Sequence, residues 1–310
     1  MAAEEKKKVT VRVPATTANL GPGFDCLGLA LDLWNECTFT LTGSQIVVEV
    51  EGEGSGLLPQ NEDNLLWQSA VRAFDRTGVK PPEGMHIACR NQIPLKSGLG
   101  SSAAAVLTGL LAGNALSGEV LGGGDILNLG ARIEEHPDNI AAALYGGLVV
   151  VSQRDDKVLT HQVQVPAFNL LVLLPEIDFS TQVSRRILPE EVPIRDAMFN
   201  ASRVPLVVDA LRTSNLYLLT QAMQDRIHQP YRLPLIPGAE AALKAAHDLD
   251  IPAALSGAGP SLIAFVLDGQ VEEAVREMRK GFEQAGVEIK VLNLTTSQVG
   301  AEVNLQVGGN

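Results

Sequence analysis

A glycine- and serine-rich segment that runs directly into an apolar stretch constrains the fold of this chain more than any other feature. Residues 94–105 read Pro-Leu-Lys-Ser-Gly-Leu-Gly-Ser-Ser-Ala-Ala-Ala. Gly98 and Gly100 let the backbone turn and approach a ligand closely, and Ser101 or Ser102 is expected to cap the helix that follows to about residue 116. The first N–H groups of such a helix lack intrahelical partners and carry the positive end of its dipole. The segment therefore predicts an anion site, with phosphate as its commonest occupant.

The plain alternative is a capped helix after a tight turn that binds nothing. Small residues around Leu99 and a first helical turn without large side chains favour a ligand site instead. The segment is not a Walker loop, because Lys96 precedes the glycines and the order Gly-Lys-Ser/Thr is missing. It also lacks the Gly-x-Ser-x-Gly order of a serine hydrolase, since the serine falls one position late.

Charge and hydropathy exclude several other classes of function. The formal net charge is −12, and no basic stripe is visible, so no nucleic-acid partner is expected. An anionic ligand must then be held by local amides, a few basic side chains and a metal ion. No apolar run approaches the length of a membrane span, and no signal-peptide pattern is expected near the start. The 3 cysteines form no CxxC pair, which predicts reduced thiols in a cytoplasmic protein without a membrane partner.

Interleaved helix and strand patterns without a regular βα repeat predict an α+β fold. Strands are expected at 9–13, 26–33, 36–42, 46–50, 85–89, 148–152, 159–165, 169–174, 253–255, 261–267 and 288–293. Helices are expected after Asp63 or Asn64 and at 101–116, 120–133, 140–145, 181–187, 195–213, 215–226, 237–248 and 270–285. A long polar loop is expected at 14–25, and a frayed tail from Ser297. The polar stretch 153–157 predicts two domains, residues 1–157 and 158–310.

Three segments, in this order and spacing, resemble the motifs of the GHMP kinases, which include galacto-, homoserine, mevalonate and phosphomevalonate kinases. They are residues 14–25, 94–102 and 255–261. The resemblance implies a two-domain GHMP kinase fold, with an N-terminal domain like domain 2 of ribosomal protein S5 and a ferredoxin-like C-terminal domain. It also implies that ATP is bound by Pro94, Leu95, Lys96, Ser97, Gly98, Leu99, Gly100, Ser101, Ser102, Ala103, Ala104, Gly257 and Gly259.

Four further segments resemble the homoserine kinases within that superfamily: residues 18–25, 136–139, 185–189 and 229–238. The resemblance implies ATP-dependent phosphorylation of the L-homoserine hydroxyl, a step towards threonine, and a homodimer. Substrate contacts implied in this way are Asn139, Arg232, and Arg185 or Arg186.

The chemistry of a zwitterionic amino acid fits these residue types. A carboxylate is best met by the planar, bidentate guanidinium of arginine. Arg232 stands in a proline-rich, rigid segment and is ranked above Arg185. An ammonium needs oxygen acceptors, for which Asp25 and Asn19 are the candidates. The alternatives are that Asn19 and Asp25 only form turns and that the arginines only cover the surface.

A metal site and the reaction mechanism follow from the same segments. Mg²⁺ takes oxygen ligands beside phosphate oxygens, and Glu134 and Ser101 are the candidate ligands, with Glu135 competing. Ser101, Asn139 and Glu134 are the candidate catalytic residues. Asp138 is not assigned as a base, because adjacent helical residues point about 100° apart, and His136 is expected to be structural, as a helix cap. Direct in-line transfer without a base is expected, since phosphoryl transfer depends mainly on positioning and charge stabilisation.

Two other functions stay open on these residues. One is another GHMP small-molecule kinase of the mevalonate or shikimate type, although a hydroxy acid would not need Asp25 as a counter-ion. The other is a non-catalytic sensor with the same fold, against which the intact glycines and Glu134 argue.

Overall fold

The computed structural model describes residues 7–154 and 157–307. Its larger part is a seven-stranded sheet in which β1 to β4 and β11 run in the order β11-β1-β2-β4-β3, while β5 joins β2 and β6 joins β5. The strands are β1 (Lys7–Asn19), β2 (Gly23–Thr42), β3 (Ile46–Gly52), β4 (Gly84–Asn91), β5 (Leu148–Arg154), β6 (Lys157–Val163) and β11 (Glu302–Val307).

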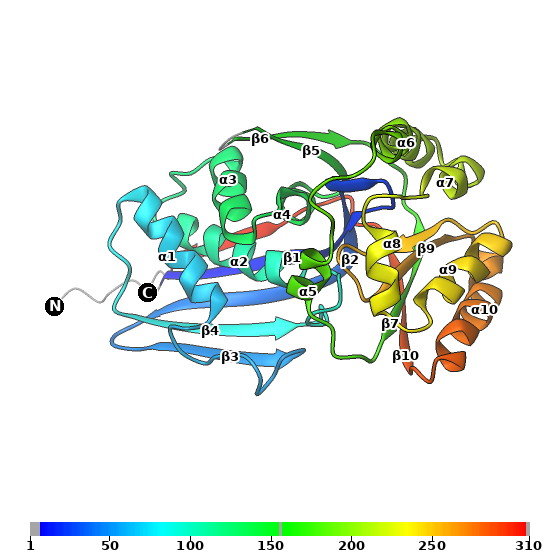
Figure 1. Cartoon of the computed structure of the whole chain (residues 1–310). Coiled ribbons are helices and arrows are strands. Elements are labelled where there is room, and N and C mark those ends of the chain that lie inside the picture. The colour runs from blue at the N-terminus through cyan, green and yellow to red at the C-terminus, as the bar shows by residue number, and fades with distance from the viewer. Residues whose placement is uncertain (1–6, 155–156, 308–310) are drawn as a thin grey trace.

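Four helices cover one face of this sheet, as Figure 1 shows. They are α1 (Leu65–Thr77), α2 (Ser101–Leu116), α3 (Gly123–Glu134) and α4 (Pro137–Tyr145). The central helix, α2, is apolar around much of its circumference, and Val106, Leu107 and Leu110 are fully buried. Such a helix must be enclosed by other elements, and it lies against α1, α3, α4 and the sheet. Its N-terminus is thereby fixed by packing on several sides.

The smaller part is an antiparallel four-stranded sheet in the order β10-β7-β9-β8. Its strands are β7 (Asn169–Pro175), β8 (Ala253–Leu255), β9 (Leu262–Val266) and β10 (Ile289–Thr295). The helices around it are α5 (Thr181–Arg186), α6 (Ile194–Thr213), α7 (Leu216–Ala222), α8 (Gln229–Arg232), α9 (Ala239–Asp248) and α10 (Val271–Gln284), with 3-10 turns at Leu233–Leu235 and Asp268–Gln270.

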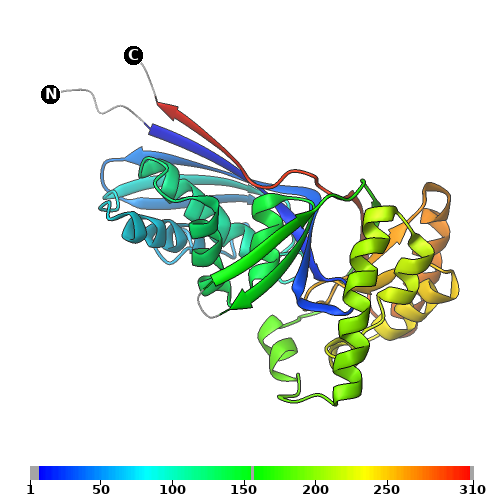
Figure 2. The same cartoon turned by 90° about the horizontal axis from the view of Figure 1, so that it is seen from above.

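Alternating residues of β7 bury both faces of this second sheet. Leu170 and Val172 belong to the core that continues into the larger part, whereas Leu171 and Leu173 pack in a separate core with Phe282 of α10. This is the two-fold alternation of a strand that is covered on both sides. The continuous core joins the two parts of the molecule at the end of the long β1–β2 hairpin (Figure 2).

The structure corrects two expectations about the N-terminal region. The polar stretch 14–25 is not a long loop, because β1 continues to Asn19 and β2 starts at Gly23, which leaves only a tight turn between them. The two strands expected at 26–33 and 36–42 are one strand. Register shifts at Pro14/Ala15 and at Ala18/Asn19 absorb the residues that broke the strand pattern.

The tail was also wrongly expected to fray. Residues 302–307 form β11, which pairs antiparallel with β1 from Lys7↔Val307 to Arg12↔Glu302, so both ends of the described chain lie together (Figure 2). The expected helix 215–226 is shorter, since α7 ends at Ala222 and the chain then turns around Asp225. Both features depend on partners far away in the sequence.

The division of the chain at residue 157 stays a prediction. Residues 155 and 156, in the polar stretch that motivated it, lie outside the described residues. β5 lies before the proposed boundary and nearly all of β6 after it, yet the two strands pair as a hairpin that extends the larger sheet to Val163. Within the described ranges no helix has the length and apolar character needed to cross a bilayer, and Cys26, Cys37 and Cys89 are free thiols.

Candidate active site

The three motifs identified in the sequence meet at one place. The backbone N–H of Thr16 donates to the carbonyl of Leu99 at 3.1 Å, and that of Gly257 donates to the carbonyl of Ala18 at 3.1 Å. The hydroxyl of Ser256 donates to the carbonyl of Gly98 at 2.8 Å. The expectation that the third motif packs against the glycine loop is therefore confirmed, and the first motif joins them.

The glycines of the loop are required by this close packing. A Cβ on Gly98 would lie 2.3 Å from the carbonyl oxygen of Ser256, and a Cβ on Gly100 would lie 2.0 Å from the Oγ1 of Thr16. Both glycines also have positive φ, +80° and +70°, which favours glycine. Leu99 between them is fully buried. The small residues of the loop therefore allow close contact with the other motifs and do not leave an open space.

The start of α2 is free for a ligand, although not in the way the sequence predicted. Gly100, not a serine, is the N-cap residue, and no side chain caps this end. Ser101 and Ser102 lie inside the first turn, so the expectation that one of them caps the helix is wrong. A cavity of about 330 Å³ adjoins this turn. It is lined by Leu95 and Lys96, by the first turn of α1, and by residues that include Asn35, Asn91, Ser101, Ser102 and Ala105.

The other predicted nucleotide contacts support the loop from inside. Pro94, Ala103 and Ala104 are buried. The Ser97 hydroxyl donates to the Pro94 carbonyl at 2.7 Å and accepts from the Leu99 N–H at 3.2 Å. In the third motif, the backbone N–H of Gly259 donates to the carbonyl oxygen of Ser256 at 2.9 Å.

Glu134 lies at the end of α3 beside the start of α2. Its Oε1 accepts a hydrogen bond from the Ser102 hydroxyl at 2.6 Å. Burial raises the pKa of Glu134, against the opposing effect of that hydrogen bond. A cation bound beside it would lower this pKa and favour the charged carboxylate. Glu135 is the C-cap residue of α3. Glu134 is thus the carboxylate that the fold brings to the loop, with Ser102 as its direct contact and Ser101 in the cavity wall.

Asn139 and Asp138 lie in the first turn of α4 near the same loop. The Oδ1 of Asn139 accepts from the Thr16 hydroxyl at 2.8 Å. Asp138 is 2% exposed, and its Oδ1 accepts from the backbone N–H of Asn139 at 2.7 Å. Burial and the nearby charge of Asp25 raise the pKa of Asp138 to about 7. His136, the N-cap residue, makes no side-chain capping bond, which corrects its expected capping role, and burial and Arg185 lower its pKa.

Asn19, Asp25 and Arg185 form the other wall of the site. The two Nη atoms of Arg185 donate to the two carboxylate oxygens of Asp25 at 3.2 and 3.0 Å. Asn19 is buried, and both ends of its amide are used: Oδ1 accepts from the N–H of Asp25 at 3.0 Å and Nδ2 donates to the carbonyl of Gly257 at 2.8 Å. Asn19 and Asp25 have positive φ, so they do form turns, and they present a carboxylate as well. Arg186 is exposed, which leaves Arg185 as the arginine of this pair that reaches the site.

Arg232 is 1% exposed and is held from several segments. Its Nε donates to the carbonyl of Ser184 at 3.1 Å, and its Nη1 donates to the carbonyl of Gly257 at 3.3 Å. The guanidinium carbons of Arg232 and Arg185 lie 5.2 and 5.6 Å from the ring centre of Phe24. Burial, and next the like charge of Arg185, lower the pKa of Arg232 to about 10.

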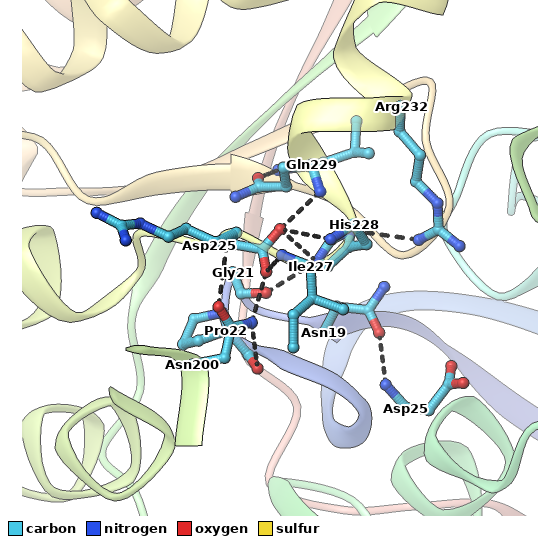
Figure 3. A network of polar contacts seen from close by, with 12 residues as sticks. Asn19, Gly21, Pro22, Asp25, Asn200, Asp225, Ile227, His228, Gln229 and Arg232 are labelled. Carbon is cyan, nitrogen blue, oxygen red and sulfur yellow. Dashed lines mark hydrogen bonds and ion pairs between the residues drawn. The ribbon is translucent and has the colours of Figure 1, made fainter. Parts of the chain in front are cut away.

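Sequence reasoning missed a group of buried polar residues behind Arg232 (Figure 3). The side chains of Asp225 and His228 are 0% exposed, and they connect Arg232 to the turn at Gly21 and Pro22 and to Asn200 of α6. Phe24 and Thr16 were also missed as site residues. The only sequence feature that pointed to Phe24 and Thr16 is that both lie in the first motif, residues 14–25.

Comparison with known proteins agrees with this arrangement. Residues 64–147 match the family model described as "GHMP kinases N terminal domain", and residues 207–284 match "GHMP kinases C terminal". The chain is 40% identical to the homoserine kinase of Moorella thermoacetica over 295 residues, which cover 94% of this chain and 99% of the relative. It is 38% identical to the homoserine kinase of Carboxydothermus hydrogenoformans over 294 residues, covering 94% and 96%.

The chain belongs to the homoserine kinase family of GHMP kinases. The crystal structure of homoserine kinase from Cytophaga hutchinsonii has the same fold, with a TM-score of 0.84 and 31% identity over 98% of this chain and 99% of that one. The α+β, two-domain GHMP kinase fold expected from the three motifs is therefore confirmed.

Proposed function

We propose that this chain transfers the terminal phosphoryl group of ATP to the side-chain hydroxyl of L-homoserine, which forms O-phospho-L-homoserine and leads towards threonine. The observation that carries the proposal is that opposite charges lie close to the glycine loop of an uncapped helix start. Asp25 pairs with Arg185, and α2 has no side-chain cap. Arg232 donates to Gly257, and the adjacent Ser256 donates to Gly98 of the loop. The names of the relatives support the same substrate.

In this proposal the nucleotide binds at the start of α2 and in the adjoining cavity. The free N–H groups of the first turn suit the phosphates of ATP. The cavity of about 330 Å³ beside them is mostly apolar, with Asn35, Asn64 and Asn91 among its lining residues. Apolar walls with a few fixed polar groups are typical of a site for a heterocyclic base.

Glu134 and the hydroxyls of Ser101 and Ser102 would hold Mg²⁺. Within the described ranges no cluster of three or more acidic, histidine or cysteine side chains forms a metal site. A single carboxylate with hydroxyls beside the phosphates fits the manner in which proteins bind Mg²⁺ with nucleotides. When bound, the ion would supply positive charge that neutralises the phosphate oxygens.

When the zwitterionic substrate binds, its two charged groups replace the ion pair between Asp25 and Arg185. Asp25 accepts the ammonium group, while Arg185 and Arg232 bind the carboxylate in the manner that suits guanidinium groups. Asn19 holds Asp25 in place, because its side-chain Oδ1 accepts a hydrogen bond from the backbone N–H of Asp25. Asn139 lies at the edge of the loop, where a Cβ on Gly100 would come 3.3 Å from its Oδ1. In this proposal it contacts the reacting end of the substrate, next to the phosphates.

Transfer proceeds in line without a general base. Asp138 is turned towards the N–H of Asn139 and is buried, so it serves the start of α4. The amides of the loop and the hydroxyls of Ser101 and Ser102 stabilise the equatorial oxygens of the transferred group. The hydroxyl proton leaves late, to phosphate or water, which a loose transition state allows.

A coupled assay of ADP release across a panel of acceptor alcohols tests the proposal. Rapid ADP formation is expected with L-homoserine and Mg²⁺, and little with mevalonate or shikimate. Preference for a hydroxy acid would instead favour another GHMP kinase activity. Nucleotide binding without turnover of any acceptor would favour a ligand sensor.

We also propose that the enzyme is a cytoplasmic homodimer, as the family resemblance implies. Light scattering coupled to gel filtration would then give twice the mass of the 32.9 kDa chain. The mass of a single chain at micromolar concentration would contradict this.

A further inference from the structure

A buried polar network fixes the orientation of Arg232 from behind (Figure 3). Its centre is the carboxylate of Asp225. Oδ1 accepts from Asn200 Nδ2 at 2.6 Å and from the N–H of Ile227 at 2.9 Å, and Oδ2 accepts from the N–H groups of His228 at 3.0 Å and Gln229 at 2.6 Å. The charge of Asp225 is thus satisfied mainly by the backbone that carries His228 into α8. A buried carboxylate bonded in this way holds its segment rigidly.

The tautomer of His228 follows from its two neighbours. Its Nε2 lies 2.8 Å from the carbonyl oxygen of Gly21, which can only accept, so Nε2 must carry the hydrogen. Its Nδ1 lies 3.3 Å from Nη1 of Arg232, which can only donate. A neutral ring with hydrogen on Nε2 satisfies both contacts, whereas a doubly protonated ring would point a donor at a donor. Burial lowers the pKa of His228, which agrees with the neutral form.

The guanidinium of Arg232 is therefore held at defined atoms. Nε is taken by Ser184 and Nη1 by Gly257 and His228. The ring of Phe24 stacks on His228 at 5.3 Å and lies beneath the guanidinium. Nη2 forms no hydrogen bond with any described residue, so this end is the one available to a ligand.

We propose that His228, held by Asp225, is a positioning residue that aims the Nη2 end of Arg232 at the substrate carboxylate. This rests on the proposed function, in which Arg232 binds that carboxylate. His228 makes no substrate contact itself. It joins two segments, the first-motif turn at Gly21 and α8, and within α8 it contacts the arginine at the far end of the helix.

Two amide substitutions separate the contacts of His228. His228→Gln places its amide where Nε2 lies and can keep the donor to Gly21, but it removes the acceptor for Arg232. His228→Asn places its oxygen where Nδ1 lies and can keep that acceptor. We expect His228→Gln to raise KM for L-homoserine by about tenfold, the effect of one hydrogen bond to a charged group, and His228→Asn to raise it several-fold less. KM for ATP stays unchanged in both, and the exposed His161→Gln serves as the matched control.

A double-mutant cycle tests whether His228 acts through Arg232. In an Arg232→Lys background, His228→Gln is expected to add little to KM for L-homoserine, because the group it orients is gone. Full additivity would overturn the proposal. So would equal rises in KM for both substrates, or unchanged KM in both single variants of an active enzyme. A wild-type chain without homoserine-dependent ADP release would overturn the proposed function itself, and with it this role.

Discussion

Asp25 and Arg185 are 160 positions apart, and their bidentate pair forms only when α5 docks beside the β1–β2 turn. Each side chain is about one-third exposed, 33% and 36%, so the pair is accessible to a substrate. Its own contribution to stability is small at that exposure. In the proposed function, the pair offers opposite charges to the two charged groups of the amino-acid substrate.

The first prediction removes the negative partner of this pair. Asp25→Asn keeps the shape of the side chain but loses the attraction for the ammonium group, so KM for L-homoserine rises by about tenfold or more. KM for ATP changes by less than about twofold. Steady-state kinetics measure both, with Asp209→Asn, which breaks an exposed ion pair with Arg212, as the control. Equal rises in both KM values would contradict the assignment.

The second prediction concerns Asp138, which is buried with a pKa of about 7 against an ordinary value of 3.8. Between these values the folded state binds more protons than the unfolded state, so stability falls as pH rises through this range. Asp138→Asn has no charge to bury and keeps an acceptor for the N–H of Asn139. The melting temperature of the variant relative to wild type is therefore expected to increase from about pH 5 to about pH 8.

The same variant tests the absence of a base. Activity of folded Asp138→Asn is expected to stay within about tenfold of wild type, because in-line transfer depends on positioning. Loss of about a thousandfold, the size expected for a general base, would give Asp138 that role instead. Circular dichroism at the assay pH serves as the check on folding.

At the scale of elements, α2 sets the position of the proposed phosphate site. It is enclosed by α1, α3 and α4, and its first turn is defined by Gly100 at φ +70° against Thr16. The element therefore connects the core to the site: packing fixes the helix, and the helix start fixes the amides.

The third prediction adds one carbon at Gly100, where the loop meets α2. Gly100→Ala would place its Cβ 2.0 Å from Thr16 Oγ1, so the loop must shift. We expect the melting temperature to fall by several degrees, as for a cost of about 2 kcal/mol, and kcat/KM to fall by about tenfold or more. Gly124→Ala in α3 is the matched control, since a Cβ there meets nothing within 4 Å, and it is expected to be neutral or slightly stabilising. Equal effects of the two substitutions would contradict the explanation.

At the scale of the whole molecule, β11 closes the larger sheet. It pairs with β1 over its full length (Figure 2), so the last described strand covers the edge of the first. Without β11, β1 would become the edge strand in its place and would lose its backbone pairing from Lys7 to Arg12.

The fourth prediction concerns a chain without β11. A chain that ends at Gly300 is expected to melt several degrees lower, because the pairing of β1 with β11 is lost. The folded fraction should keep kcat within about twofold, because β11 lies away from the three motifs. A chain that ends at Val307 is the control. Unchanged melting of the shorter chain would show that β11 contributes little.

The sequence by itself determined the family, the α+β class, most helices and strands, and the glycine loop at the start of α2. These follow from local information: hydrophobic period, turn residues, and motifs whose residues are contiguous. The pattern Glu-Val-Asn-Leu-Gln-Val at 302–307 alternates as a strand does, yet its position near the end of the chain suggested fraying. Local pattern alone does not say whether a partner strand is available.

The tertiary structure alone decided which polar side chains line the candidate site and which support the fold. Asn19 and Arg232 were both expected to contact substrate, but the fold occupies both ends of the Asn19 amide and most of the Arg232 guanidinium. Asp225 and His228 carry no contiguous motif, and their role appears only when Asn200 and Gly21 are brought to them. The physical reason is that a hydrogen bond joins atoms in space, and the sequence order of a chain does not fix which distant donors and acceptors will meet.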